Sequence, residues 1–110
     1  SDTFYEFAAP LMRQLGWPTL FCHQLVVDEN GVVRDYSLRM RDQKREAVRR
    51  FRELNFKTVA AGDSYNDTAM LAEAHHGIFF RPPANIVGEF PQFPVTRDYD
   101  ELKTAILAVI

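Results

Sequence analysis

The stretch "TVAAGDSYNDTAML", residues 58–71, constrains the fold more than any other part of the sequence. A short run of β-branched residues and alanine ends at Gly62, and an apolar pattern of helical period resumes at Asn66. Asp63 follows Gly62 directly, and Asp67 lies four residues later, at the start of the second segment. This order is typical of the junction between a strand and the following helix in an α/β sheet.

Strand-like and helix-like segments alternate along most of the remaining chain. Helices are expected at residues 3–15, 42–54, 66–74, 83–89 and 98–109, and strands at 57–61 and 77–80. Residues 24–38 form two β-rich runs around Asn30-Gly31, a pair that favours the positive φ values of a tight hairpin turn. The pattern predicts an α/β fold, with a parallel sheet, flanking helices and a hairpin at its edge.

The ends of the predicted helices carry recognisable signals. Thr3 and Glu6 have the spacing of a capping box, and Gly16 followed by Pro18 ends the first helix. In the second helix Ala47, Val48, Phe51 and Leu54 are expected to face inward, and Arg45, Arg49 and Arg52 outward.

Length and composition narrow the class of protein. With 110 residues, 46% of them hydrophobic, the chain is expected to form one domain, residues 1–110. The net charge of −2 does not indicate a nucleic acid or an anionic membrane as partner. The single cysteine, Cys22, cannot form an internal disulfide, which together with the lack of a signal pattern favours a cytoplasmic protein.

Several polar residues are expected at one rim of the sheet. Ligands collect outside the carboxyl ends of parallel strands, and Asp63, Asn66 and Asp67 follow such an end. Lys44 opens the helix at 42–54, where the helix dipole adds to its positive charge. Ser1 and the amides of residues 2–4 are expected to open another helix, a natural anion site.

These residue types suit a divalent metal and a phosphate group. Carboxylate and amide oxygens are hard ligands that Mg²⁺ accepts, and bound Mg²⁺ keeps waters and often bridges to a substrate phosphate. Simpler explanations stay open, because Asp, Ser and Asn are also favoured helix caps and Lys44 alone fits a surface lysine. The functional interpretation depends on three independent elements that point to one rim.

The same residues resemble the motifs of the haloacid dehalogenase-like phosphatases. "GDSYNDTAML" resembles their fourth motif, "SDTF" their second, and Lys44 in "RDQKREAV" occupies the third. Asn66 and Asp67 point to the phosphoserine phosphatase branch. Essentially the whole chain resembles members of that branch that also transfer a phosphoryl group to homoserine.

The resemblance implies a phosphoaspartyl mechanism that depends on Mg²⁺. It makes Asp63 a metal ligand, and it places Asp67 beside it, orienting a metal-bound water or Lys44. Ser1, Asp2, Thr3 and Lys44 would hold the phosphoryl group, and Asn66 would contact the phosphate or the substrate. The implied substrate is phosphoserine, with water or homoserine as the acceptor.

One motif of the family is missing. The nucleophile motif has the form Asp-x-Asp-Gly, and the only Asp-x-Asp here, Asp98-Tyr99-Asp100, follows no apolar strand and is interpreted as a helix cap. We therefore expect the C-terminal half of such an enzyme, without its nucleophile strand and helical cap domain. Alone, the 110-residue chain is expected to be inactive and poorly stable.

Other classes remain as alternatives. A noncatalytic protein that binds phosphate and Mg²⁺ would have the same rim, whereas a response-regulator receiver would place its lysine after the acids, not before them. The basic segment 39–52 fits a solvated helix face better than a nucleic-acid patch. His75 and His76 are adjacent and have no partners at zinc-ligand spacing, and Cys22 fits core packing. Residues 90–94 are expected to form a turn packed on the sheet, and they could also contact a second copy in a homodimer.

Overall fold

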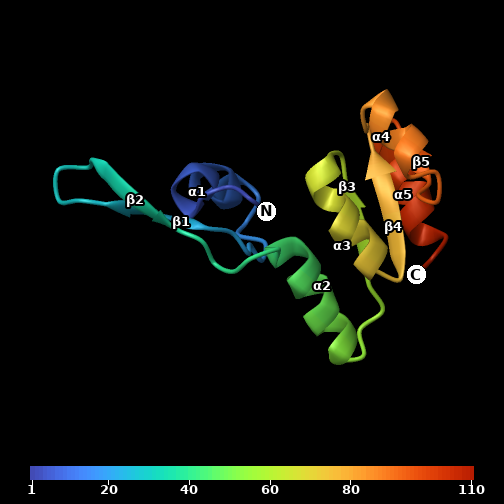
Figure 1. Cartoon of the computed structure of the whole chain (residues 1–110), viewed down its shortest axis with the longest axis horizontal. Helices are drawn as coiled ribbons and strands as arrows, with labels where there is room; N and C mark the ends of the chain where they lie inside the picture. Colours follow the sequence, from blue (N-terminus) through green and yellow to red (C-terminus); the bar gives the residue numbers. More distant parts are fainter. The chain divides into compact units, whose positions relative to one another are not determined.

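The computed structural model describes residues 1–110 and divides them into two compact units, residues 1–43 and residues 44–110 (Figure 1). The first unit contains helix α1 (Tyr5–Gln14) and the strands β1 (Gln24–Val27) and β2 (Val33–Ser37). β1 and β2 pair antiparallel, with Gln24 opposite Ser37, and form a two-stranded sheet of their own. The predicted hairpin is confirmed. Its turn is longer than the expected tight turn, since residues 28–32 connect β1 to β2. Gly31 has a positive φ of 78°, but Asn30 does not.

The start of α1 corrects two expectations. Residues 1–4 do not open the helix but run extended beside residues 21–23, with Phe4 and His23 in a parallel bridge. The amide of Tyr5 donates to the His23 carbonyl at 2.8 Å, which fixes the helix start there. The predicted capping box is also wrong, since the Glu6 carboxylate accepts from the Leu25 amide instead. The helix ends as predicted, with Gly16 at a φ of 75°.

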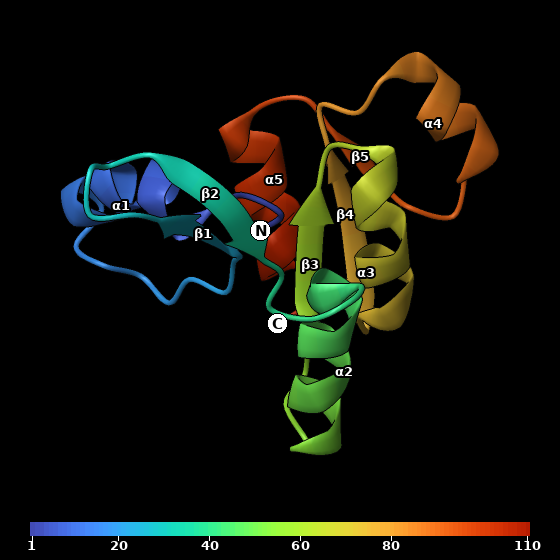
Figure 2. The same ribbon diagram turned by 60° about the vertical axis from the view of Figure 1, so that its left-hand side comes forward.

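The second unit holds the parallel sheet and all of α2 (Gln43–Glu53) except its first residue, Gln43, which belongs to the first unit. Its other elements are β3 (Val59–Gly62), the 3-10 helix η1 (Tyr65–Asp67), α3 (Thr68–Glu73), β4 (His76–Phe80), α4 (Ala84–Glu89), β5 (Val95–Thr96) and α5 (Tyr99–Leu107). The strand order is β3-β4-β5 and both pairs are parallel, as predicted. α3 lies on one side of this sheet and α5 on the other (Figures 1 and 2).

A small apolar core lies between α3, α4 and the sheet. Phe79 and Leu71 are almost completely buried and pack with Ala60 and Ile86. Phe93 meets the Phe79 ring edge-on at 5.4 Å between ring centres. Residues 90–94, expected to form a turn against the sheet, thus contribute to the core and lead into β5, a two-residue strand that the sequence pattern does not predict.

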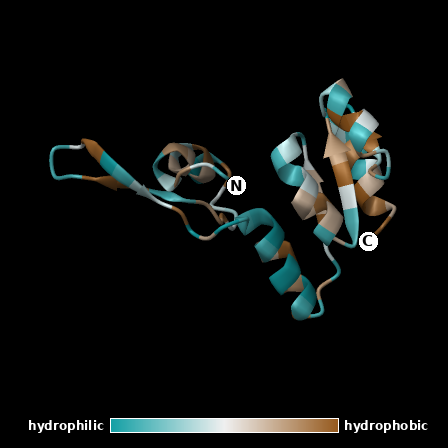
Figure 3. Ribbon diagram, in the orientation of Figure 1, coloured by the Kyte–Doolittle hydropathy of each residue, from teal (hydrophilic) through white to brown (hydrophobic).

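α2 is much less buried than its periodic pattern suggested. Figure 3 shows a mostly hydrophilic ribbon for α2, in contrast to the apolar centre of β4. Ala47 and Val48 are half-buried, but Phe51 and Leu54 are exposed, so the predicted inward face is wrong in its second half. The cap prediction at the last helix is confirmed, since Asp98 accepts from the Glu101 amide at 2.8 Å. None of the helices has the length and apolar character needed to span a membrane.

The stability of the isolated chain can be tested directly. Six apolar residues are buried while nineteen large apolar side chains are exposed, and β3 pairs with a strand on one side only. Burial on this scale barely offsets the conformational entropy of folding. We expect the 110-residue chain to unfold over a broad range at low temperature, as followed by circular dichroism.

The full-length protein is the control for this melt. It should unfold cooperatively at a clearly higher temperature under the same conditions. A cooperative transition of the 110-residue chain well above room temperature would contradict the prediction.

Candidate functional site

The candidate site lies at the carboxyl end of β3. Asp63 follows the last residue of this strand, and η1 begins two residues later, so the turn brings Asp63 and Asp67 to the same edge. A cavity of about 170 Å³ opens beside Asp63 and is also lined by Phe80, at the end of β4, and by Leu102 of α5. The neighbouring strand ends therefore border one hollow, as expected for a ligand site in a parallel sheet.

Asp67 organises the turn. Only 5% of the residue is exposed, and its Oδ2 atom accepts from the amides of Asp63 and Ser64 at 3.0 and 3.1 Å. The Ser64 hydroxyl donates to the same oxygen at 3.1 Å. The capping explanation of this turn therefore applies to Asp67, whose carboxylate satisfies amides that would otherwise be left unpaired.

Gly62 is what lets Asp67 come so close. A Cβ atom at position 62 would lie 2.6 Å from Cγ and 2.7 Å from Oδ2 of Asp67. No side chain fits in that space unless Asp67 moves. The glycine of the motif is thus required by a close approach, and not by an unusual backbone angle.

Lys44 completes the charge balance around Asp67. Its Nζ atom donates to Asp67 Oδ1 at 2.8 Å, and the two side chains are 20% and 7% exposed. Burial raises the pKa of the Asp67 carboxyl, but the Lys44 ammonium and the Ser64 and Asp63 amides outweigh it, so the pKa lies below its usual value. Asp67 therefore stays ionised, as the partner of Lys44.

Asp63 has the opposite environment. It is exposed, and its carboxylate accepts no hydrogen bond from the described residues 1–110. Because Asp67 is saturated by donors, Asp63 is the carboxylate at this edge that is open to a ligand. Asn66 is exposed one residue before Asp67 on η1, where its amide can reach solvent.

This edge offers a divalent cation one free carboxylate, that of Asp63, and not a complete set of protein ligands. Residues 1–110 hold no group of three or more His, Cys, Asp or Glu side chains that could bind a metal. Mg²⁺ suits such a site better than Zn²⁺, because it is often held by one or two carboxylates, waters and a substrate phosphate. The donor set at Asp63 fits that pattern.

The predicted residues Ser1, Asp2 and Thr3 lie in the first unit. The Thr3 amide donates to the Ser1 hydroxyl at 3.3 Å, and Asp2 lies 4.0 Å from Nε2 of His23. Their convergence with Asp63 on one rim stays a prediction. The amides of residues 2–4 do not form a helix N-terminus, because the extended backbone there pairs with residues 21–23.

Two buried polar residues near Ser1 were missed by the sequence analysis. The Gln43 side-chain amide donates to the Ser1 carbonyl and lies 3.2 Å from Nε2 of His23. His23 in turn accepts from the Arg39 amide at Nδ1. Neither residue belongs to a motif. The only signal in the sequence that could have indicated them is a polar residue at a position where the pattern predicts an apolar one.

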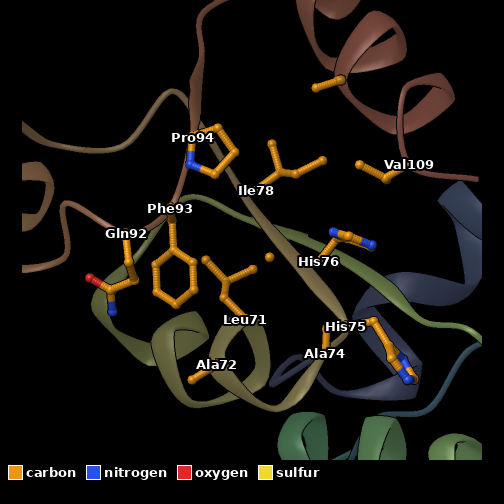
Figure 4. A pocket seen from close by; sticks show the side chains of 12 residues that line it. Leu71, Ala72, Ala74, His75, His76, Ile78, Gln92, Phe93, Pro94 and Val109 are labelled. Carbon is orange, nitrogen blue, oxygen red and sulfur yellow. The ribbon is translucent and has the colours of Figure 1, made fainter.

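A second cavity lies at the other end of the sheet. It has a volume of about 260 Å³ and is lined mainly by apolar side chains, among them Leu71, Ile78 and Phe93 (Figure 4). His76, the first residue of β4, also lines it. None of the predicted site residues does, so this cavity is separate from the edge that carries Asp63.

Solved structures identify the class of fold. A substrate-bound phosphoserine phosphatase complex matches 93% of this chain and 51% of its own, with a TM-score of 0.72 and 23% identity. A phosphoserine phosphatase in apo form matches 97% of this chain and 55% of its own, with a TM-score of 0.72 and 20% identity. The fold is that of phosphoserine phosphatases, and the predicted fold class is confirmed.

Curated proteins give the closer likeness. The chain is 56% identical over 107 residues to "Phosphoserine phosphatase ThrH" of Pseudomonas aeruginosa. The aligned region covers 97% of this chain and 52% of that protein. It is 58% identical over 103 residues to a phosphoserine phosphatase of Pseudomonas syringae pv. tomato, over 94% of this chain and 44% of that protein. No family model matches. The chain spans about half the length of these relatives, and the predicted resemblance over part of such a protein is confirmed.

The close approach at Gly62 can be tested by adding one methyl group. Gly62→Ala should push Asp67 away from the amides of residues 63 and 64 and destabilise the full-length protein by about 1–3 kcal/mol, the usual range for overpacking. Urea unfolding measures the change. Gly88→Ala is the matched control, because nothing lies within 4 Å of a Cβ there, and a loss of equal size in both variants would contradict the prediction.

The ion pair also predicts a pH dependence of stability. The folded-state pKa of Asp67 is lowered, so its stabilising contribution is present above the unfolded pKa of about 3.9 and is lost as the pH falls through the folded value. Between about pH 5 and pH 2 the full-length protein should lose more unfolding free energy than its Asp67→Asn variant. Parallel curves for the two proteins would rule this out.

Proposed function

We propose that this chain is part of a Mg²⁺-dependent phosphoserine phosphatase. The observation that carries the proposal is the contrast at the end of β3, where Asp67 is saturated and paired with Lys44 while Asp63 is exposed and unpartnered. The likeness to phosphoserine phosphatases, at up to 58% identity, supports the same reaction class.

Asp63 would bind Mg²⁺, which, when bound, offsets the negative charge of a phosphoryl group. The fixed amide of Asp63 holds the main chain in place while the carboxylate remains free to reach the ion. Lys44 would face the phosphoryl oxygens from the other side, and its contact with Asp67 restricts the position of the ammonium.

The remaining predicted residues would complete the phosphate site. Ser1, Asp2 and Thr3 would supply hydroxyl and amide donors, and Asn66 would contact the phosphate or the substrate. The attacking carboxylate would come from a residue that this chain does not supply. The resulting phosphoaspartate would then pass its phosphoryl group to water, or to the hydroxyl of homoserine.

The proposed setting follows from the same features. The substrate would be a small phosphate ester, with neither a nucleic acid nor a membrane as partner, and a homodimer is consistent with the exposed apolar side chains. The single cysteine, which is buried, supports a reducing compartment such as the cytoplasm.

The proposal is tested on the full-length protein. We expect release of phosphate from phosphoserine that requires added Mg²⁺ and that falls at least a hundredfold in Asp63→Asn, as for the loss of one main charge-stabilising group. The matched control is Asp100→Asn, an exposed aspartate on α5, which should keep full activity. Adding homoserine and measuring phosphohomoserine decides between the two acceptors.

Activity of Asp63→Asn equal to that of the unmodified protein would remove Asp63 from the metal site. Absence of any phosphatase activity, with Mg²⁺ and phosphate still bound, would instead favour the noncatalytic binding protein. Isothermal titration with Mg²⁺ and inorganic phosphate distinguishes that outcome from loss of the fold.

A further inference from the structure

α2 presents Lys44 at its first turn, yet few apolar contacts hold this helix in place. Phe51 in α2 is 40% exposed, and Leu54, directly after the helix, is 67% exposed. Within the helix only Gln43, at its start, is buried. A helix whose apolar stripe is this thin is positioned by its polar contacts. The position of Lys44 beside Asp67 therefore depends on the contacts that hold the rest of α2.

Glu73, the last residue of α3, contacts α2 twice. Arg45 Nε lies 3.4 Å from Glu73 Oε2, and Arg52 Nη1 lies 3.2 Å from Glu73 Oε1. Arg52 also donates to the main-chain carbonyl of Glu73 at 2.7 Å. That carbonyl is one of those a helix leaves unpaired at its C-terminus, so the contact also caps α3.

These contacts fix α2 at two separate points. Lys44 is bound to Asp67, directly before α3, and the two arginines are bound to Glu73 at its end. Arg45 and Arg52 are seven residues apart, about two helical turns or 10 Å. One ion pair alone would let α2 pivot about Lys44, whereas a second contact farther along the helix prevents it.

We propose that Glu73 is a positioning residue, which holds α2 through Arg45 and Arg52 so that the Lys44 ammonium stays in place at Asp67. The proposal rests on the proposed function for its effect on the reaction, and on the geometry alone for its effect on Lys44. Exposed ion pairs taken singly contribute little, but the Glu73 side chain is only 18% exposed and joins two arginines and a carbonyl in one network.

Arg45 and Arg52 are exposed, as predicted from the pattern of the helix. Their side chains, more than two-fifths exposed, nevertheless reach Glu73. Arg49, by contrast, pairs within its own helix with Glu46 and Glu53. Arginines of the basic segment thus form two kinds of ion pair: Arg45 and Arg52 join α2 to α3, and Arg49 pairs within α2.

The test compares Glu73→Ala with Glu53→Ala in the full-length protein. Glu53 also accepts from two arginines, Arg49 and Arg50, but all three belong to α2, so its loss removes the same kind of ion pair without releasing the helix. Glu73→Gln serves as a second variant that keeps the side-chain volume. Circular dichroism checks that each variant is folded.

The first measurement does not depend on activity. Acetic anhydride labels unprotonated lysine amines, and mass spectrometry reports the rate at Lys44 relative to the exposed Lys57 and Lys103. We expect Lys44 to be labelled several-fold faster in Glu73→Ala and Glu73→Gln than in the unmodified protein, and to be unchanged in Glu53→Ala. Equal Lys44 labelling in all four folded proteins would overturn the proposal.

The second measurement is phosphoserine hydrolysis. A displaced Lys44 should lower kcat about tenfold or more while KM stays within about twofold, because the ammonium acts on charge that develops during transfer. An equal loss in Glu53→Ala would contradict a positioning role for Glu73. If the protein shows no phosphatase activity at all, the proposed function fails, and the labelling result still decides the role of Glu73.

Discussion

The structure of the candidate site depends on one buried carboxylate. Asp67 accepts hydrogen bonds from two main-chain amides, a hydroxyl and the Lys44 ammonium. The turn after β3, the start of α3 and the start of α2 therefore all meet at this side chain. A buried charge is tolerated only when it is paired and hydrogen-bonded, and here every donor comes from the site itself. The geometry of the edge therefore follows from satisfying this one group.

The division of work between the two aspartates follows from that constraint. Asp67 is held by its neighbours and contributes order, whereas Asp63 contributes an accessible charge. In a phosphoryl-transfer site most of the catalysis comes from positioning and from charge stabilisation. A fixed Asp67 next to an accessible Asp63 carboxylate is an arrangement that suits such chemistry.

Strong periodic patterns allowed the sequence to predict most of the fold. The strand before Gly62, the parallel pairing and the cap at Asp98 were foreseen, because each depends on local signals of residue type and spacing. β5 was missed because two residues carry no period, and the start of α1 was misplaced because a tertiary pairing with residues 21–23 overrides the local cap signal. Glu73 could not be foreseen, since its role arises only when α2 and α3 lie side by side.

The free carboxylate of Asp63 has a consequence for how such a protein could change over time. Only the main-chain amide of this residue is engaged in the turn, so almost any side chain at position 63 is compatible with the same backbone. The side chain at position 63 can therefore change without changing the fold of the turn. If Asp63 binds the proposed ion, a change at position 63 would remove the ion and leave the scaffold intact, whereas a change at position 67 would disturb both.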